Sequence, residues 1–380
     1  SNEDSATVII RDSKFTLNNA TYGGAIYNIG DKATVTIYNS HIAQNNAENN
    51  GGAIYNSADY YRGYSIVTIY NTNLTDNTAG FMFTFLGSTY YGTGNGGAIY
   101  NAGYNSTVTI YNANLTHNTA GFIYIHLGLT DYETGNGGAI YNTGGNFTLY
   151  DANIAYNDAN KDGGAIYNKG NGILNVTDSN LTHNNATDGG AIMRYYGTLT
   201  INNSNFNYNT ATNDGGAIYN HGTLSISDST LSNNIARGGG AIINNGTLTI
   251  INSTFTNNTG VARTKSGAIL NNGTLNIIQS NFTDNRGFSG AAIKNDIRGK
   301  MNITQCIFTN NMVSGILGAD EGGAIENIGT MTITNSTPAA FTLSQSTSPC
   351  HFETSIPFDF PSIICMYSVS IIFPFSFSKS

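Results

Sequence analysis

The tetrapeptide Gly-Gly-Ala-Ile recurs along the chain, and its period constrains the fold more than any other feature. Where no insertion intervenes, successive copies begin 24 to 28 residues apart. A period of this length indicates a solenoid, whose repeats bury their apolar faces only by stacking on one another. The copies begin at Gly23, Gly51, Gly96, Gly137, Gly163, Gly189, Gly215, Gly239 and Gly322, and degenerate copies begin at Ser266 and Gly290.

A second signature lies later in each repeat, where an apolar residue is followed three positions on by asparagine, as in Phe255 and Asn258. Between the two signatures, apolar and polar residues alternate, as in 247–250, which is typical of a half-buried strand. No apolar stripe with a helical period is present. We therefore expect an all-β chain in which each repeat forms one coil, with strands near Gly-Gly-Ala-Ile-x-Asn, Thr-Leu-Thr-Ile and Phe-x-x-Asn.

Asparagine recurs two positions after the isoleucine of the first signature. In a stack of coils these side chains form a ladder, because stacked amides hydrogen-bond up and down the stack. The ladder is interrupted only at Arg194, and we interpret it as scaffold. Its members are Asn28, Asn56, Asn101, Asn142, Asn168, Asn220, Asn244, Asn271, Asn295 and Asn327.

The paired signatures resemble the repeat of chlamydial polymorphic outer-membrane proteins, and Asn- and Thr-rich versions occur in adhesin-like surface proteins of methanogenic archaea. The resemblance covers about residues 6–337. It implies a right-handed parallel β-helix of about eleven coils, exposed outside the cell and often used in adhesion. A chlamydial member would end in a membrane-embedded β-barrel, and the 43 residues after Thr337 are too few for one. We therefore expect no membrane-spanning part in this chain.

The sequence divides into a repeat domain at residues 1–337 and an irregular tail at residues 338–380. All five prolines lie after Thr337, and no glycine follows Gly329. The apolar stretch 363–377 is too short and too interrupted for a spanning helix. The tail is open to three interpretations: a cap on the last coil, a poorly ordered segment, or a non-native segment. The last two are favoured over the cap.

The amino-acid composition of the chain indicates which classes of partner to expect. Charged residues make up 10% of the chain, the net charge is −8, and lysine and arginine are scattered. Nucleic-acid surfaces show basic clusters, so we expect no nucleic-acid partner. The expected location is the cell surface or the extracellular space, and the expected partners are glycans or surface proteins of a host or neighbouring cell.

Tyrosines supply the first candidate binding surface. The residue between the inward isoleucine and asparagine points outward from the coil. A second outward row follows on the next strand, at Tyr38, Tyr70, Tyr111 and Tyr150. Flat amphipathic rings suit glycan or protein binding, although tyrosine is also an ordinary exposed strand residue. The first row consists of Tyr27, Tyr55, Tyr100, Tyr141, Tyr167 and Tyr219.

Two matched insertions supply the second candidate surface. Residues 80–87 and 121–128 occupy the same point of adjacent coils, and both alternate in the manner of strands. We expect them to pair as an extra strand ladder that projects from the rod as a binding face, or to pack onto the coil below. The candidate residues are Phe81, Phe83, Phe85, Phe122, Tyr124 and His126.

An acidic row is the only candidate metal site. Asp162, Asp188 and Asp214 precede the glycine pair in three consecutive coils, about 5 Å apart by the strand spacing. Such carboxylates repel one another unless a cation or protons intervene, and calcium is the natural candidate. The competing interpretation is a solvated row of turn residues, screened by Lys161 and Arg237. No other cofactor is indicated.

The expectation is that the chain is not an enzyme. The alternative is a polysaccharide-active β-helix enzyme resembling pectate lyases, with the three aspartates and Arg194 as its candidate residues. Asp76 and His117 are expected to be neighbours on adjacent coils, but no substrate-positioning set accompanies them. A minor alternative is ice binding by an interrupted outward array of threonine pairs, at Thr34/Thr36, Thr107/Thr109, Thr198/Thr200, Thr247/Thr249 and Thr330/Thr332.

Overall fold

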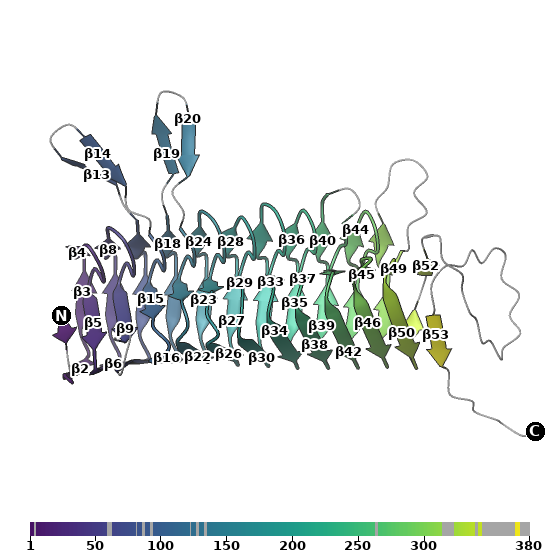
Figure 1. Cartoon of the computed structure of the whole chain (residues 1–380), viewed down its shortest axis with the longest axis horizontal. Helices are drawn as coiled ribbons and strands as arrows, with labels where there is room; N and C mark the ends of the chain where they lie inside the picture. The colour runs from purple at the N-terminus through teal and green to yellow at the C-terminus, as the bar shows by residue number, and fades with distance from the viewer. Residues whose placement is uncertain are drawn as a thin grey trace, which may run out of the picture.

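The chain winds into a rod of stacked coils, with β1 at one end and the last described strand, β53, at the other (Figure 1). The computed structural model describes residues 1–3, 5–58, 63–80, 82–85, 88–91, 94–121, 123–126, 129–132, 135–262, 265–313, 323–338, 341–343 and 369–372. For Asn2, for residues 82–85, 88–91, 123–126 and 129–132, and from residue 337 onward, the description covers the backbone alone.

Four long parallel sheets run the length of the rod, so each coil contributes one strand to each sheet. The expected right-handed parallel β-helix is confirmed. The sequence predicted three strands per coil, and the structure adds a fourth, a two-residue strand that follows the Phe-x-x-Asn corner. Among the described residues there is no helix.

Sheet A contains the Ile-x-Asn segments. Its strands are, in spatial order, β1 (Asn2–Glu3), β5 (Ile26–Gly30), β9 (Ile54–Ala58), β15 (Ile99–Ala102), β21 (Ile140–Asn142), β25 (Ile166–Asn168), β29 (Ile192–Arg194), β33 (Ile218–Asn220), β37 (Ile242–Asn244), β41 (Ile269–Asn271), β45 (Ile293–Asn295), β49 (Ile325–Asn327) and β52 (Phe341–Leu343).

Sheet B contains the alternating segments of the Thr-Leu-Thr-Ile type. Its strands are β2 (Thr7–Arg11), β6 (Lys32–Tyr38), β10 (Tyr64–Tyr70), β16 (Ser106–Tyr111), β22 (Asn146–Tyr150), β26 (Ile173–Thr177), β30 (Thr198–Asn202), β34 (Thr223–Ser227), β38 (Thr247–Ile251), β42 (Thr274–Ile278), β46 (Lys300–Thr304), β50 (Thr330–Thr334) and β53 (Val369–Ile372).

Sheet C contains the apolar residue of the second signature. Its strands are β3 (Lys14–Thr16), β7 (His41–Ala43), β11 (Asn73–Thr75), β17 (Asn114–Thr116), β23 (Asn153–Ala155), β27 (Asn180–Thr182), β31 (Asn205–Asn207), β35 (Thr230–Ser232), β39 (Thr254–Thr256), β43 (Asn281–Thr283), β47 (Ile307–Thr309) and β51 (Thr337–Pro338).

Sheet D consists of two-residue strands that lead back to the glycine pairs. Its strands are β4 (Asn19–Ala20), β8 (Asn46–Ala47), β12 (Thr78–Ala79), β18 (Thr119–Ala120), β24 (Asp158–Ala159), β28 (Asn185–Ala186), β32 (Thr210–Ala211), β36 (Ile235–Ala236), β40 (Thr259–Gly260), β44 (Arg286–Gly287) and β48 (Met312–Val313).

One apolar core fills the interior of the described coils. Inward side chains alternate with outward ones along each strand, so like residues of neighbouring coils stack on one another. On sheet C, Phe255, Phe282 and Phe308 form such a stack, with ring centroids 4.8 and 5.0 Å apart. All three rings are buried. Each coil therefore depends on its neighbours for its burial.

Two asparagine ladders satisfy the buried corners. The expected ladder at the end of each sheet A strand is present, with Nδ2-to-Oδ1 distances of 2.7 or 2.8 Å between successive coils on either side of Arg194. The asparagines of the second signature form another ladder, as Asn184, Asn209 and Asn234 illustrate at 3.0 and 3.1 Å. Both ladders lie inside the coils.

Each matched insertion folds on itself, which corrects the expectation that the two pair with each other. β13 (Met82–Phe85) pairs with β14 (Ser88–Tyr91), and β19 (Ile123–His126) pairs with β20 (Leu129–Tyr132), both antiparallel. Each insertion returns to its starting point on the coil, which favours a hairpin. Both hairpins project from the same side of the rod (Figure 1).

The described residues from Thr337 onward extend the sheets. Thr337–Pro338 pairs with sheet C, Phe341–Leu343 with sheet A, and Val369–Ile372 with sheet B. The remainder of residues 338–380 lies outside the described part of the chain, and the interpretation of the tail stays a prediction.

Candidate binding surfaces

The first tyrosine row forms a continuous stack on the outer side of sheet A. Successive rings are nearly parallel from Tyr55 to Tyr167, with centroids 5.0 to 5.1 Å apart, and Tyr27 stacks on Tyr55 at 5.2 Å. This distance matches the coil spacing, so each ring covers the face of the next. The stack ends where Met193 replaces tyrosine, and Tyr219 follows on the next coil.

The stacking corrects the prediction that this row displays flat, exposed rings. Tyr141 and Tyr167 are only 8% and 6% exposed, and Tyr27, Tyr55, Tyr100 and Tyr219 are half-buried. The rings do point away from the core, but their neighbours cover them. Burial, followed by the neighbouring phenols, raises the pKa of Tyr100 and Tyr167 well above the ordinary tyrosine value. The row therefore stabilises the stack more than it offers rings to a ligand.

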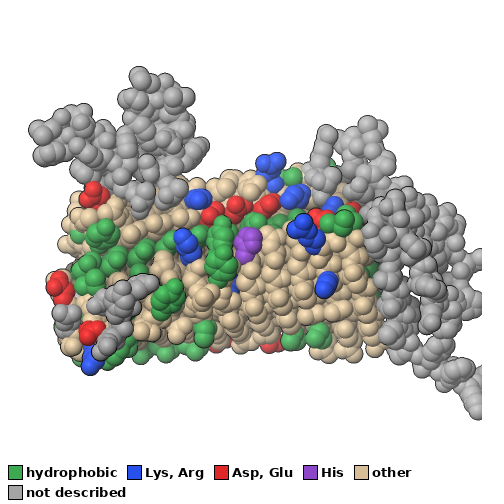
Figure 2. Space-filling view, in the orientation of Figure 1, with side chains coloured by type: hydrophobic (Ala, Val, Ile, Leu, Met, Phe, Trp, Pro, Cys, Tyr) green, Lys and Arg blue, Asp and Glu red, His purple; other side chains and the backbone are tan. Residues whose placement is uncertain are grey.

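The acidic row lies beside this stack. Figure 2 shows a band of hydrophobic side chains along the rod with acidic side chains next to it. Asp162 bridges to Asp188 through the backbone, and Asp188 Oδ1 accepts hydrogen bonds of 3.0 Å from Asn213 and from the backbone of Asp214. Lys265 lies 3.6 Å from the Asp214 carboxylate. Lys265, which lies two coils beyond Asp214, thus partly compensates the negative charge of the row.

Asp162 is buried at 6% exposure, which corrects the picture of a fully solvated row. Burial, and then the charge of Asp188, raises the pKa of Asp162 to about 6. Within the described part of the chain, no three His, Cys, Asp or Glu side chains form a group that could hold a metal ion. Calcium binding at Asp162, Asp188 and Asp214 therefore stays a prediction, because the described side chains do not form a group of ligands around one point.

The second tyrosine row lies on the outer side of sheet B. Tyr38, Tyr70, Tyr111 and Tyr150 stack with centroids 4.9 to 5.2 Å apart. Arg11 lies 4.2 Å from the centroid of the first ring, a cation–π contact. Tyr150 is 39% exposed and ends the stack, since Thr177 follows it. The threonine pairs share this face, and ice binding stays an untested alternative.

A third aromatic stack lies at the corner between sheets C and D. His117, Tyr156, His183 and Tyr208 stack in that order, with centroids 5.2, 4.7 and 5.0 Å apart. Tyr156 and Tyr208 are 52% and 53% exposed, and both histidines are exposed. We call these four residues the corner stack. It is the most exposed of the three aromatic stacks.

The backbone of the corner stack is left-handed, with φ between 55 and 57° at all four residues. Such a conformation is uncommon for residues other than glycine, and asparagine and aspartate adopt it most readily. Other coils follow that preference at this corner, for example with Asp76, Asn233 and Asn257. Histidine also adopts this conformation more often than most residues, so it is the two tyrosines that occupy the corner at a conformational cost.

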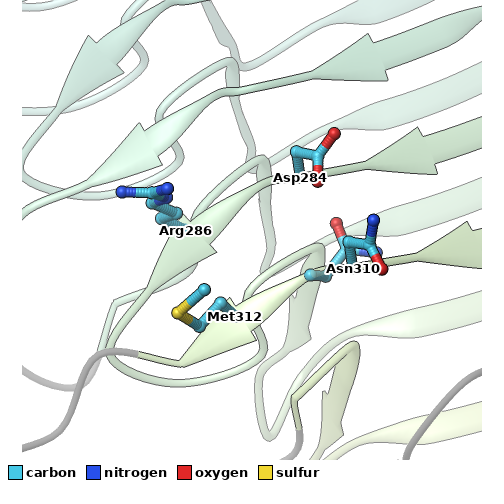
Figure 3. Close-up of a pocket in the computed structure, with 5 residues that line it drawn as sticks. Asp284, Arg286, Asn310 and Met312 are labelled. Atoms are coloured by element: carbon cyan, nitrogen blue, oxygen red, sulfur yellow. The ribbon is translucent and has the colours of Figure 1, made fainter.

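The chemistry of this corner changes towards the C-terminal end of the rod. There Asp284 and Asn310 take the corner positions and line a surface pocket together with Arg286, Asn311 and Met312 (Figure 3). This pocket is lined by charged and amide groups and one methionine, without an aromatic ring. The aromatic part of the corner is thus confined to four coils in the middle of the rod.

Sequence reasoning missed the corner stack as a surface. The signal was present, since each of its residues directly precedes the ladder asparagine of the second signature, as Tyr156 precedes Asn157. His117 does follow Asp76 on the next coil, as expected, because Thr75 pairs with Thr116.

The insertion candidates cannot be placed as side chains. Phe81 and Phe122 lie outside the described residues. Phe83 and Phe85 lie on β13, and Tyr124 and His126 lie on β19, where only the backbone is described. Their role in binding stays a prediction.

Arg194, the cation proposed for an enzyme site, is fully buried. It occupies the inward asparagine position of β29, where it pairs in register with Asn220 of the next coil. A fully buried guanidinium does not reach a substrate at the surface, so the position of Arg194 does not support the proposed enzyme set. The enzyme alternative stays a prediction.

Comparison with known proteins agrees with the architecture. The chain is a parallel β-helix solenoid, and the repeat at residues 203–221 matches the model of the Chlamydia polymorphic membrane protein repeat. The resemblance inferred from the paired signatures is thereby confirmed for that repeat, and an archaeal origin is not shown. No curated protein matches the chain.

Among solved structures, a PL6 alginate lyase in complex with a trisaccharide is similar at 11% identity. The match covers 87% of this chain and 83% of the lyase, with a TM-score of 0.34. Among the described residues, no helix is long and apolar enough to cross a membrane.

Proposed function

We propose that this chain is a surface-exposed, adhesin-like rod that binds a glycan or protein partner through its corner stack. The observation that carries the proposal is the placement of four exposed aromatic rings in left-handed backbone. None of the four belongs to the hydrophobic core. Residues held in unfavourable backbone conformations gather at functional sites, where the surrounding structure holds them in place.

The stack offers a specific set of contacts. Because each ring covers the next, the ring edges and polar atoms face outward rather than the ring faces. Phenol hydroxyls and imidazole nitrogens alternate along the corner at the coil spacing of about 4.8 Å. Tyrosine and histidine of this kind can pair with hydroxyl and amide groups while burying apolar surface. A glycan or an extended polypeptide carries such groups at regular intervals.

Location at the cell surface belongs to the same proposal. The matched repeat comes from a family of polymorphic membrane proteins, which supports a place outside the cell. The rigid rod would hold the corner stack and the two hairpins away from an anchor. The predicted contributions of the tyrosine rows and of Phe83, Phe85, Tyr124 and His126 remain part of this binding hypothesis.

The test replaces Tyr156, His183 and Tyr208 together with asparagine in the full chain, since asparagine already stands at this corner in Asn233 and Asn257. We expect the triple variant to fold with undiminished thermal stability, because asparagine accepts left-handed backbone. Binding to glycan arrays and to cells should fall at least about tenfold, since one interface aromatic is often worth more than about 1 kcal/mol.

The matched control is Tyr104→Asn, which removes a tyrosine that is 71% exposed and lies outside the corner stack. Its binding should equal that of the unchanged protein. Equal losses in the two variants, or full binding by the triple variant, would reject the corner as the binding surface.

The proposal treats the chain as non-enzymatic, and a polysaccharide-active enzyme is the alternative. Incubation with acidic and neutral polysaccharides distinguishes the two. Release of new reducing or unsaturated ends by the unchanged protein would replace the binding proposal with catalysis.

A further inference from the structure

The asparagine ladder of sheet A fails at one coil. Elsewhere each Nδ2 donates to the Oδ1 of the next coil, as Asn142 does to Asn168 at 2.7 Å and Asn220 does to Asn244 at 2.8 Å. At Arg194 the next side chain in line is a guanidinium, which donates but cannot accept. The Nδ2 of Asn168 is therefore buried without a partner among the described residues.

Arg194 is likewise buried without a hydrogen-bond partner among the described residues. The side chain is 0% exposed, and Nε, Nη1 and Nη2 all lack a hydrogen-bond partner in the described part of the chain. Burial lowers the pKa of Arg194 to about 10, so the guanidinium remains a cation at neutral pH. A buried, unpaired charge is among the most costly groups that a protein interior can hold.

The surroundings of the guanidinium are tight. A methyl group added to Gly222 on the next coil would lie 2.7 Å from Nη2 and 3.0 Å from Nε. The neighbouring Asn220 is already committed, because its Oδ1 accepts from the backbone of Gly222 and its Nδ2 donates to Asn244. Among the described residues, four buried donor atoms on two adjacent coils, Asn168 Nδ2 and Arg194 Nε, Nη1 and Nη2, thus have no acceptor, and they carry one positive charge.

We propose that Arg194 and Asn168 form an internal binding site for a small monovalent anion of the halide class. A single anion accepts from the guanidinium and from the amide at once and neutralises the buried charge. Complete burial excludes a side chain of a partner molecule as the acceptor. The single guanidinium matches one negative charge, and the contact with Gly222 disfavours a large oxyanion.

Anion binding at this site would stabilise the middle coils of the rod. Because an anion that binds only the folded state stabilises that state, chloride should raise the melting temperature of the unchanged protein. We compare sodium chloride with sodium gluconate at equal concentration, so that ionic strength and cation are constant. The expected result is a higher melting temperature in chloride, which increases with its concentration and then saturates.

Arg194→Asn is the matched variant, since asparagine stands at this position in the neighbouring coils and would restore the ladder from Asn168 to Asn220. This variant should show the same melting temperature in both salts. A chloride effect of equal size in the variant, or no difference between salts in the unchanged protein, overturns the proposal.

A direct measurement keeps the test independent of the variant. Crystals of the full chain soaked in bromide should show an anomalous peak beside the Arg194 guanidinium. Bromide peaks confined to the surface, with none at this position, would also reject the site. Neither result depends on whether the corner stack binds a partner.

Discussion

Asn209 shows what a single ladder residue contributes. Its Oδ1 accepts from the backbone and the side chain of Asn184 at 3.1 and 3.0 Å. Its Nδ2 donates to Leu181 and to Asn234 at 2.9 and 3.1 Å. A buried corner has no water to satisfy these groups, so the amide replaces solvent. Each unmade bond of this kind costs about 1–3 kcal/mol.

Asp162 is the residue whose protonation should affect stability. Its folded pKa is raised to about 6, from 3.8 for an unperturbed carboxyl, with burial as the main cause. The folded state therefore holds the proton more tightly than the unfolded state, and stability is lost as pH rises from about 4 to above 6. A shift of this size corresponds to at most about 3 kcal/mol.

Asp162→Asn should remove this part of the pH dependence. Urea unfolding at pH 4 and pH 7 should show a smaller loss of stability for the variant than for the unchanged protein. Asp178→Asn is the control, because Asp178 is an exposed corner residue in the following coil. If the Asp162 variant keeps the full pH dependence, the carboxyl is not the group responsible.

Residue-level burial was the part of the site that sequence patterns predicted least well. Alternation placed Tyr141 and Tyr167 on the outer side of their strands, which is correct, but it carried no information on how closely rings of adjacent coils approach. Because the coil spacing matches the centroid separation of stacked rings, the rings of adjacent coils cover one another and outward tyrosines become buried. Asp162 is buried beside the same stack. The period of the sequence pattern indicates the direction in which a side chain points, whereas the exposed fraction of that side chain depends on the residues of the neighbouring coils.

At the element scale, the repeats were predictable and the insertions were not. The two signatures and the alternating segment between them predicted three of the four sheets. Sheet D escaped prediction because its strands are two residues long and carry no such pattern. The hairpins were mistaken for partners of each other because alternation identifies a strand without identifying what it pairs with.

Each hairpin should be removable without loss of the coil. The stems meet at a close approach, since a methyl group on Gly94 would lie 1.9 Å from the carbonyl carbon of Ala79, and one on Gly135 would lie 2.1 Å from the nitrogen of Gly121. Deleting residues 81–93 or 122–134 should leave β12 and β18 paired with their neighbours. We expect an unchanged melting temperature in both deletions.

Binding assays on the same deletions address the insertion hypothesis. If Phe81, Phe83, Phe85, Phe122, Tyr124 and His126 contact the partner, removing the hairpins should weaken binding while the fold persists. Deletions that bind as well as the unchanged protein would confine recognition to the rod. A marked loss of thermal stability would show instead that the hairpins support the coils.

The whole molecule is a one-dimensional stack of coils. The effect of a destabilising substitution should therefore depend on which coil carries it. Aromatic stacks cover the N-terminal and middle coils, whereas the row that begins with the sheet A tyrosines continues in the last coils with Leu270, Lys294 and Glu326. Arg194 lies in the coil that also carries Tyr208, the last residue of the corner stack. A break on the C-terminal side of this coil would separate the corner stack from the C-terminal coils without removing either part.

Ile218→Asp tests this dependence on position. Ile218 is fully buried on β33, so the substitution places an unpaired charge in the core and should open the coils on both sides, at a cost of several kcal/mol. Ile10→Asp, in the first coil, is the comparison, since Ile10 is only partly buried at the end of the core. Hydrogen exchange should show lost protection spreading in both directions from residue 218, but confined to the first coil for the terminal variant. Equal, global loss of protection in both variants would mean that the rod unfolds as one cooperative unit rather than coil by coil.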